Sequence, residues 1–174
     1  MKCSVTGWQI AGFLFTAVAG TLLHFLYEWA GKSAVAGVFS AVNESIWEHM
    51  KLIYFPMLIF SLIQRKYADD SQFWCVKLAG NLIALLLIPM VYYTYTGALG
   101  ISADWFNITI FFLAAGVAYY VETKLFQNFA FCPIPSGIAL AGLFLTGALF
   151  VLFTFYPPAI PLFADPRTGL SGIS

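Results

Sequence analysis

The sequence predicts an all-α, polytopic membrane helix bundle with about five transmembrane helices and a cytoplasmic N-terminus. Of its 174 residues, 61% are hydrophobic and only 9% are charged, whereas a soluble domain carries about 25% charged residues. Five apolar runs are each close to the ~20 residues that a helix needs to cross a bilayer. Because a helix satisfies its own backbone hydrogen bonds in lipid, each run is expected to be helical.

Short connections separate the five runs, so residues 1–174 are expected to form a single integral membrane domain. The predicted helices are Gly7–Trp29, Ile46–Ile63, Phe73–Tyr95, Trp105–Val121 and Ile134–Tyr156. Residues 34–41 are apolar but too few to span the membrane, which predicts a re-entrant or interfacial piece. Pro56 and Pro89 each remove a backbone donor within a predicted helix and are expected to kink it.

A proline-rich tail follows the last predicted helix, over residues 157–174. Its four prolines prevent a continuous helix and favour an extended chain. The tail leaves the membrane on the same side as the ends of the first and third helices. It is therefore expected to fold back over that side as a lid, with Asp165 or Arg167 touching the residues beneath.

Basic residues predict the orientation, because cytoplasmic loops are enriched in Lys and Arg. One membrane side carries Lys2, Arg65, Lys66, Lys77 and Lys124, and the other carries Lys32, Lys51 and Arg167. This imbalance places the N-terminus in the cytoplasm and the tail outside. Cys3, Cys75 and Cys132 all fall on the predicted cytoplasmic side, where thiols stay reduced, so no disulfide framework is expected.

Unusual polar chemistry gathers on the predicted outer side. His24 and Glu28 are four residues apart, and so are Glu44 and Glu48, so each pair shares a helix face. Consecutive helices commonly pack as neighbours. The sequence therefore predicts a site for a cation or protons formed by His24, Glu28, Glu44, Glu48 and His49. Residues expected to surround this site or close over it are Asn43, Tyr93, Asp104, Asp165 and Arg167.

Two functions follow from such a site. Ionisable side chains near lipid are energetically costly and commonly mark ion or proton pathways, which favours cation or proton binding linked to transport. Transport predicts a polar path that continues inward past Asn81. The alternative is a metal-dependent enzyme acting on a lipid or a small periplasmic substrate. In that enzyme His24, Glu28, Glu48 and His49 would bind zinc, iron or manganese, and one glutamate would act as general base.

A third interpretation is a non-catalytic scaffold. Asn43 is a good N-cap, and a helix start favours the negative charges of Glu44 and Glu48. Scaffolding predicts that every carboxylate pairs with a lysine or a backbone cap and that no cavity is present. Besides the lipid bilayer, candidate partners are an ion or small molecule and a second copy of the chain. With no basic patch and no net charge, nucleic-acid binding is not expected.

Three segments carry a resemblance to a known group of proteins. They are residues 24–29, residues 42–51, and Ile160-Pro161-Leu162-Phe163 with Asp165-Pro166 and Gly169. The Asn-Glu-Ser-Ile-Trp-Glu-His run within the second segment is the most specific of them. The chain resembles, over essentially its whole length, an uncharacterised family of small bacterial integral membrane proteins, a domain of unknown function. The resemblance implies a bacterial protein, for which the cytoplasmic membrane is the expected location, and it carries no assigned activity.

Overall fold

A computed structural model describes residues 4–68, 71–127 and 132–173. Its helices are α1 (Val5–Trp29), α2 (Ala34–Phe39), α3 (Ile46–Arg65), α4 (Phe73–Leu99), α5 (Asp104–Gln127) and α6 (Ser136–Phe155). Five of them, all but α2, are long and apolar enough to cross a membrane. The described residues contain no strand beyond one isolated bridge between Ala164 and Ser171. The predicted helical membrane bundle is confirmed, and the chain is built as a multi-pass membrane protein.

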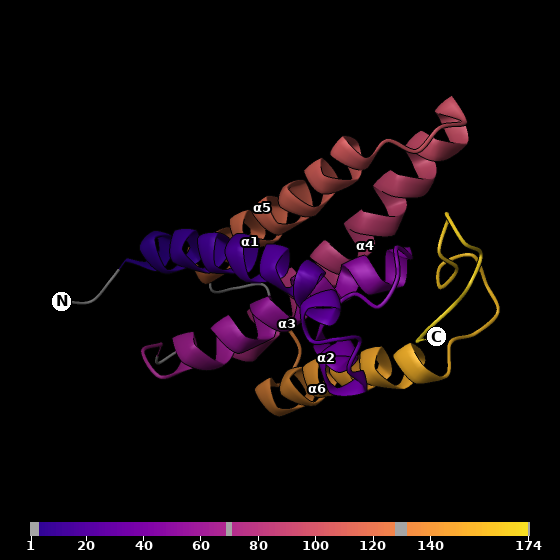
Figure 1. Cartoon of the computed structure of the whole chain (residues 1–174). Helices are drawn as coiled ribbons and strands as arrows, with labels where there is room; N and C mark the ends of the chain where they lie inside the picture. The colour runs from indigo at the N-terminus through magenta and orange to yellow at the C-terminus, as the bar shows by residue number, and fades with distance from the viewer. Residues whose placement is uncertain (1–3, 69–70, 128–131, 174) are drawn as a thin grey trace.

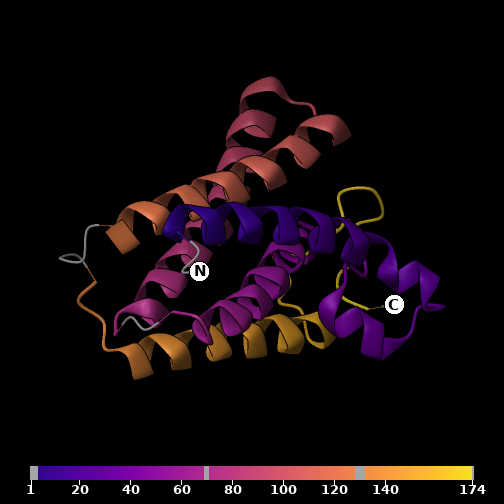
Figure 2. The same ribbon diagram turned by 90° about the vertical axis from the view of Figure 1, so that its left-hand side faces the viewer.

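Helix α3 is the core of the bundle. It packs against α1, α4 and α6 and touches α2 and α5, whereas α1 and α5 pair with each other on one side. Figures 1 and 2 show α6 on the opposite side of α3 from α1, and the end of α4 projecting with the start of α5 as a hairpin. Interior side chains of α3 such as Ile53 and Tyr54 are fully buried, although this helix is among the least apolar of the five long helices.

Small residues on α1 let that helix approach its neighbours closely. A Cβ added at Gly12 would lie 2.5 Å from the Tyr119 ring, and one added at Gly20 would lie 2.6 Å from the carbonyl oxygen of Leu52. Pro56 has no backbone N–H, so it cannot donate to this Leu52 carbonyl four residues earlier. The freed carbonyl lies against Gly20, which explains why that position holds no side chain.

The bundle has two ends, which we name by their contents. The cavity end holds the last turn of α1, the first turn of α3, the last turn of α6 and the tail. The disulfide end holds the first turn of α4, where Cys75 is bonded to Cys132 between α5 and α6. The expectation of reduced cysteines is therefore wrong, because folding joins two residues 57 apart that form no local motif.

This disulfide removes the cysteine argument for the orientation. Disulfides persist in oxidising compartments, whereas the basic residues place the same end in the cytoplasm. The cytoplasmic N-terminus stays a prediction that rests on the basic residues alone.

Candidate functional site

The connection between α2 and α3 has a tightly fixed backbone. Ser45 is the N-cap of α3, and its hydroxyl accepts a hydrogen bond from the Glu48 amide at 3.4 Å. The Glu48 carboxylate accepts from the Val42 amide at 3.0 Å, three residues before the N-cap, whereas in a capping box it would accept from the N-cap amide itself. Asn43 precedes the cap, where its side-chain oxygen accepts from the Ser45 amide at 2.9 Å. The N-cap of α3 is therefore Ser45, two residues after the expected Asn43, and Glu44 precedes the helix.

Glu48 lies within a buried network away from the other predicted site residues. Its carboxylate is 2.7 Å from the Lys51 ammonium. Lys51 also donates to the Gly37 carbonyl and to the Thr154 hydroxyl, each at 2.8 Å. Because both charged groups are almost fully buried and Lys51 has three acceptors, this network joins α2, α3 and α6. Glu28 forms an exposed pair with Lys32 at 3.5 Å; it does not line the main cavity described below, but it lines a smaller hollow together with His24 and Glu44.

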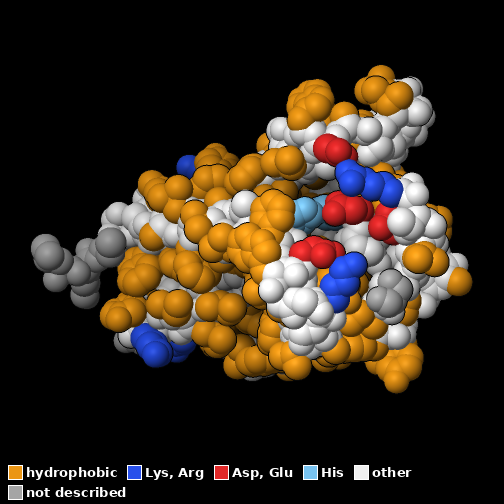
Figure 3. Space-filling view, viewed as in Figure 1, with side chains coloured by type: hydrophobic (Ala, Val, Ile, Leu, Met, Phe, Trp, Pro, Cys, Tyr) orange, Lys and Arg blue, Asp and Glu red, His pale blue; other side chains and the backbone are white. Residues whose placement is uncertain are grey.

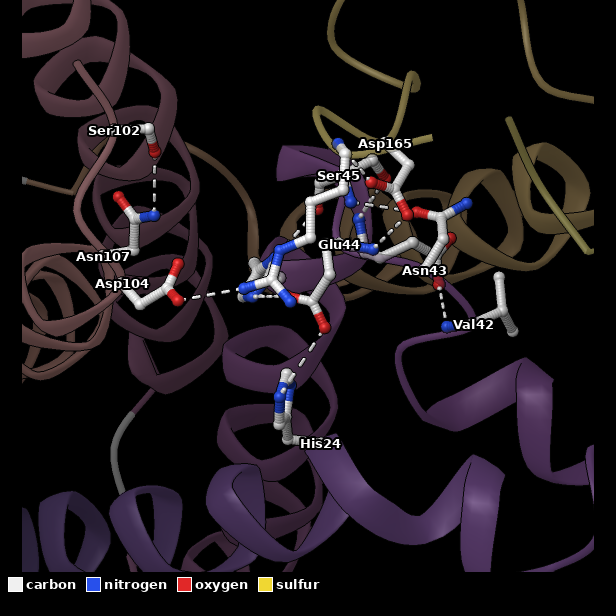
Figure 4. A network of polar contacts seen from close by, with 12 residues as sticks. His24, Val42, Asn43, Glu44, Ser45, Ser102, Asp104, Asn107 and Asp165 are labelled. Carbon is white, nitrogen blue, oxygen red and sulfur yellow. Dashed lines mark hydrogen bonds and ion pairs between the residues drawn. The ribbon is translucent and has the colours of Figure 1, made fainter. Parts of the chain in front are cut away.

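The structure brings together His24 of α1, Glu44 of the connection between α2 and α3, and His49 of α3. The two oxygens of Glu44 lie 3.9 Å from His24 Nε2 and 3.5 Å from His49 Nε2. The two imidazole centroids are 5.6 Å apart. Figure 4 shows Glu44 turned toward His24 between α1 and the tail. About a third of each side chain is exposed, so water reaches all three.

The hydrogen bond at the other ring nitrogen of His49 fixes its tautomer. Nδ1 lies 2.9 Å from the Ser45 carbonyl oxygen. A carbonyl oxygen only accepts, so Nδ1 carries a proton and the neutral ring presents a lone pair at Nε2. That lone pair faces a Glu44 carboxylate oxygen 3.5 Å away.

These three residues lie at the mouth of a cavity of about 540 Å³ between α1, α3, α4 and α5, within the size range of small-molecule sites. Figure 3 shows a pale-blue histidine surface beside acidic and basic side chains, with hydrophobic groups around them. Polar lining residues are Thr21, His24, Glu44, His49, Ser102, Asp104, Asn107 and Arg167. Apolar lining residues include Phe25, Leu52, Ile88, Ile110, Phe111 and Phe112. The site is amphipathic, with a charged mouth and an apolar floor.

The tail borders the cavity mouth through Pro166 and Arg167. The Arg167 guanidinium lies 3.0 Å from the Asp104 carboxylate of α5. The hydrogen bond and the charge of Asp104 raise the pKa of Arg167 above its ordinary value. Both side chains are mostly exposed, so this contact spans the rim rather than the floor.

Asp165 attaches the tail to the α2–α3 connection. Its carboxylate accepts from the backbone amides of Arg167 at 2.7 Å, Thr168 at 3.3 Å and Glu44 at 3.4 Å. Burial alone would raise the pKa of Asp165, but these amide hydrogen bonds outweigh it and hold the pKa below its ordinary value. Trp47 adds an apolar attachment, with its ring 4.7 Å from that of Phe163.

Several residues that line the cavity were not predicted from the sequence, and one predicted tyrosine does not line it. Asn107 lies one helical turn after Asp104 and donates to the Ser102 hydroxyl at 3.2 Å; that spacing was a usable signal. Thr21 precedes His24 by three residues and gave a similar signal. Tyr92 lines the cavity, whereas the predicted Tyr93 does not appear among the lining residues.

The metal site remains a prediction. Among the residues that the structure describes, no group of three or more His, Cys, Asp or Glu side chains is arranged to hold a metal ion. Of the four predicted ligands, His24 and His49 are neighbours, whereas Glu28 and Glu48 each pair with a lysine.

Comparison with known proteins gives a family and no activity. The profile of a family of unknown function, DUF6512, matches residues 1–173. No curated protein and no solved structure matches the chain. The function must therefore be argued from the site.

Proposed function

We propose that this chain, which belongs to the DUF6512 family of unknown function, binds a small organic cation in exchange for protons, as part of transport across the membrane. The observation that carries this proposal is the position of Glu44 between two imidazoles at the mouth of the cavity. Among the described glutamates, Glu28, Glu48 and Glu122 each pair with a lysine, whereas Glu44 pairs only with histidine.

The charges lining the cavity favour a cation whenever the histidines are neutral. Glu44 and Asp104 contribute two negative charges, and Arg167 contributes one positive charge. One negative charge is then in excess. Protonation of His24 and His49 would reverse the sign and expel a cation. Because histidine is the side chain that ordinarily titrates near neutral pH, binding of a cation and binding of protons are expected to compete.

The shape and lining of the cavity favour an organic cation over a bare metal ion. A volume of about 540 Å³ is far larger than an ion needs. Phe25, Phe111, Phe112 and Tyr92 supply aromatic rings, which attract organic ammonium groups through their π faces. An apolar floor beneath a charged mouth suits a molecule with one cationic group and a hydrophobic body.

Transport requires the cavity to open toward the opposite side of the membrane. The floor is closed by Leu52 and Ile88, and the cavity lining does not reach Asn81. Both floor residues lie close to a helix proline, Pro56 in α3 and Pro89 in α4. Each proline interrupts the backbone hydrogen bonding of its helix, which provides a place where the floor can move.

The experiment is equilibrium binding of tetraphenylphosphonium to the purified full-length protein as a function of pH. Binding should tighten as pH rises, because the competing protons leave the histidines. Glu44→Gln should weaken binding at least about tenfold, which corresponds to ~1.4 kcal/mol. Glu28→Gln is the matched control and should bind as the wild type does, since Glu28 does not line this cavity and is paired with Lys32. Equal binding by the wild type and Glu44→Gln would contradict the proposal.

A metal-dependent enzyme is the second candidate, and one contact favours it. Two imidazole Nε2 atoms lie within 4 Å of one carboxylate, and His and carboxylate groups are the usual donors for zinc, iron and manganese. Elemental analysis of the purified protein tests this candidate. Stoichiometric metal that is lost in both Glu44→Gln and His49→Ala would favour the enzyme over the cation exchanger.

A further inference from the structure

A second charged cluster lies at the disulfide end of the bundle, apart from the cavity. Lys77 of α4 and Glu122 of α5 form an ion pair with Nζ and Oε2 2.6 Å apart. Gln9 of α1 lies beside them, with its side-chain oxygen 3.4 Å from Lys77 Nζ. Asn81 follows one turn after Lys77 and donates to its carbonyl oxygen at 2.9 Å. We name these four residues the Lys77–Glu122 cluster; each is at least 98% buried.

Three polar atoms of this cluster lack a hydrogen-bond partner within the part of the chain that the structure describes. They are Gln9 Nε2, Asn81 Oδ1 and Glu122 Oε1. One is a donor and two are acceptors, and buried groups of both kinds are commonly satisfied by ordered water. An unpartnered carboxylate oxygen is energetically costly in a buried setting, so the cluster is expected to be hydrated.

The surroundings isolate the ion pair from lipid and from other charges. The rings of Phe73, Tyr119 and Phe126 lie 5.5–5.7 Å from Lys77 Nζ. Tyr119 is the titratable group of α5 nearest the pair, and its hydroxyl bonds to Thr16 of α1 at 2.8 Å. From α3, the Arg65 guanidinium lies 5.7 Å from the centre of the Phe73 ring and donates to the Ala68 carbonyl. Lys77 is therefore the single cation that contacts Glu122 among the described residues.

A glycine makes room for the carboxylate. A Cβ added at Gly80 would lie 2.2 Å from Glu122 Oε1. The chain thus places a glycine in α4 opposite a glutamate in α5. Two apolar side chains at these positions would pack together without removing any charge from water. A buried ion pair adds little net stability over such packing. Ionisable residues within membrane helices are commonly functional.

We propose that the Lys77–Glu122 cluster is a second proton-binding site, hydrated and located at the end of the bundle opposite the cavity. A proton passes from Lys77 Nζ to Glu122 Oε2 along their hydrogen bond, which converts the ion pair into a neutral amine and a neutral carboxylic acid. The acid then releases its proton to water, and the amine takes up another. Each step transfers one proton and needs no other reactant.

Location suggests a role for this second site in exchange. Gln9 and His24 are fifteen residues apart on α1, so the two sites are separated by about 22 Å along that helix. The Thr16–Tyr119 hydrogen bond lies between them. The idea that protons bound at the cavity leave through the Lys77–Glu122 cluster rests on the proposed function. Proton exchange at the cluster itself does not depend on that function.

The test is infrared spectroscopy of the full-length protein in lipid vesicles, with ¹³C-labelled glutamate and no added cation. The pH is varied across the range in which the protein stays folded, in H2O and in D2O. We expect a protonated-carboxyl band that changes with pH and shifts in D2O. The band should persist in Glu44→Gln, which separates this site from the cavity, and should be lost in Glu122→Gln.

Loss of charge at one partner alone leaves the other buried and unpaired, so Glu122→Gln could unfold the bundle. The double variant Lys77→Gln/Glu122→Gln removes both charges and supplies the folded comparison. The comparison is made in the Glu44→Gln background. A protonated-carboxyl band that is the same there with and without Lys77→Gln/Glu122→Gln would overturn the proposal. That result would leave cation binding at the cavity unaffected.

Discussion

Arg167 of the tail and Asp104 of α5 form an ion pair across the rim of the cavity, with the guanidinium 3.0 Å from the carboxylate. The two residues are 63 positions apart in the chain. Because Pro166 and Arg167 line the cavity mouth, the pair connects the tail to the far wall of the site. We infer that it holds the tail as a lid over the cavity.

The first prediction concerns this lid. The double variant Arg167→Ala/Asp104→Ala should increase the dissociation rate of tetraphenylphosphonium several-fold, because the tail loses its attachment to α5 while the net charge of the cavity lining stays the same. The melting temperature should stay unchanged, since exposed ion pairs contribute little to stability. Stopped-flow fluorescence and thermal unfolding in detergent check both outcomes. Lys32→Ala breaks another exposed pair and serves as the control; the lid is absent if both variants release the cation equally fast.

The second prediction concerns the buried Glu48–Lys51 pair. Lys51→Met should destabilise the protein by about 3–5 kcal/mol, because Glu48 would be left buried without a counter-charge. Lys32→Met, at an exposed position, should change little. Unfolding in detergent measures the difference. Equal stability of these two variants would show that Lys51 does not join α2, α3 and α6.

The third prediction concerns close packing at the cavity floor. Gly20→Ala should lower stability by roughly 1–3 kcal/mol, the usual cost of overpacking, and should weaken cation binding. Its new Cβ would meet the Phe111 ring at 2.5 Å and the Leu52 carbonyl at 2.6 Å. Gly137→Ala is the matched control, because nothing lies within 4 Å of its added Cβ. Similar melting temperatures for the two variants would argue against the α1–α3 contact.

The fourth prediction concerns the pH dependence of the tail. The pKa of Asp165 is lowered on folding, mainly by amide hydrogen bonds that outweigh the effect of burial. The carboxylate therefore stabilises the docked tail above the ordinary Asp pKa of about 3.9, and this stabilisation is lost as pH falls toward the lowered value. Hydrogen exchange should show that the amides of Arg167 and Thr168 lose protection in acid. In Asp165→Asn they should be less protected at neutral pH; unchanged protection there would contradict the prediction.

The fifth prediction concerns the disulfide. Alkylation of the denatured, unreduced protein should modify one cysteine, Cys3, and reduction beforehand should expose all three. Cys75→Ser/Cys132→Ser should lower stability by about 2–4 kcal/mol, because the unfolded chain gains freedom. Mass spectrometry counts the modified thiols. Three reactive thiols without a reductant would restore the expectation of reduced cysteines.

The sequence predicted the five long helices well, because lipid leaves few alternatives to a helix for an apolar run of that length. Within the site it predicted the neighbours His24, Glu44 and His49, since residues at the ends of consecutive helices meet. It failed for Glu48, because helical spacing cannot show that Lys51 turns toward the same carboxylate. The Cys75–Cys132 bond and the Arg167–Asp104 pair depend on tertiary packing across distant parts of the chain, which no local pattern encodes.

Cation–proton exchange at Glu44 is tested by counting the protons released when the cation binds. Calorimetric titration of the wild type with tetraphenylphosphonium, repeated in buffers of different ionisation enthalpy, gives that number at each pH. We predict proton release in the wild type that diminishes as pH rises and is absent in Glu44→Gln. Cation binding without proton release at any pH, or release that persists in Glu44→Gln, would contradict exchange at this site.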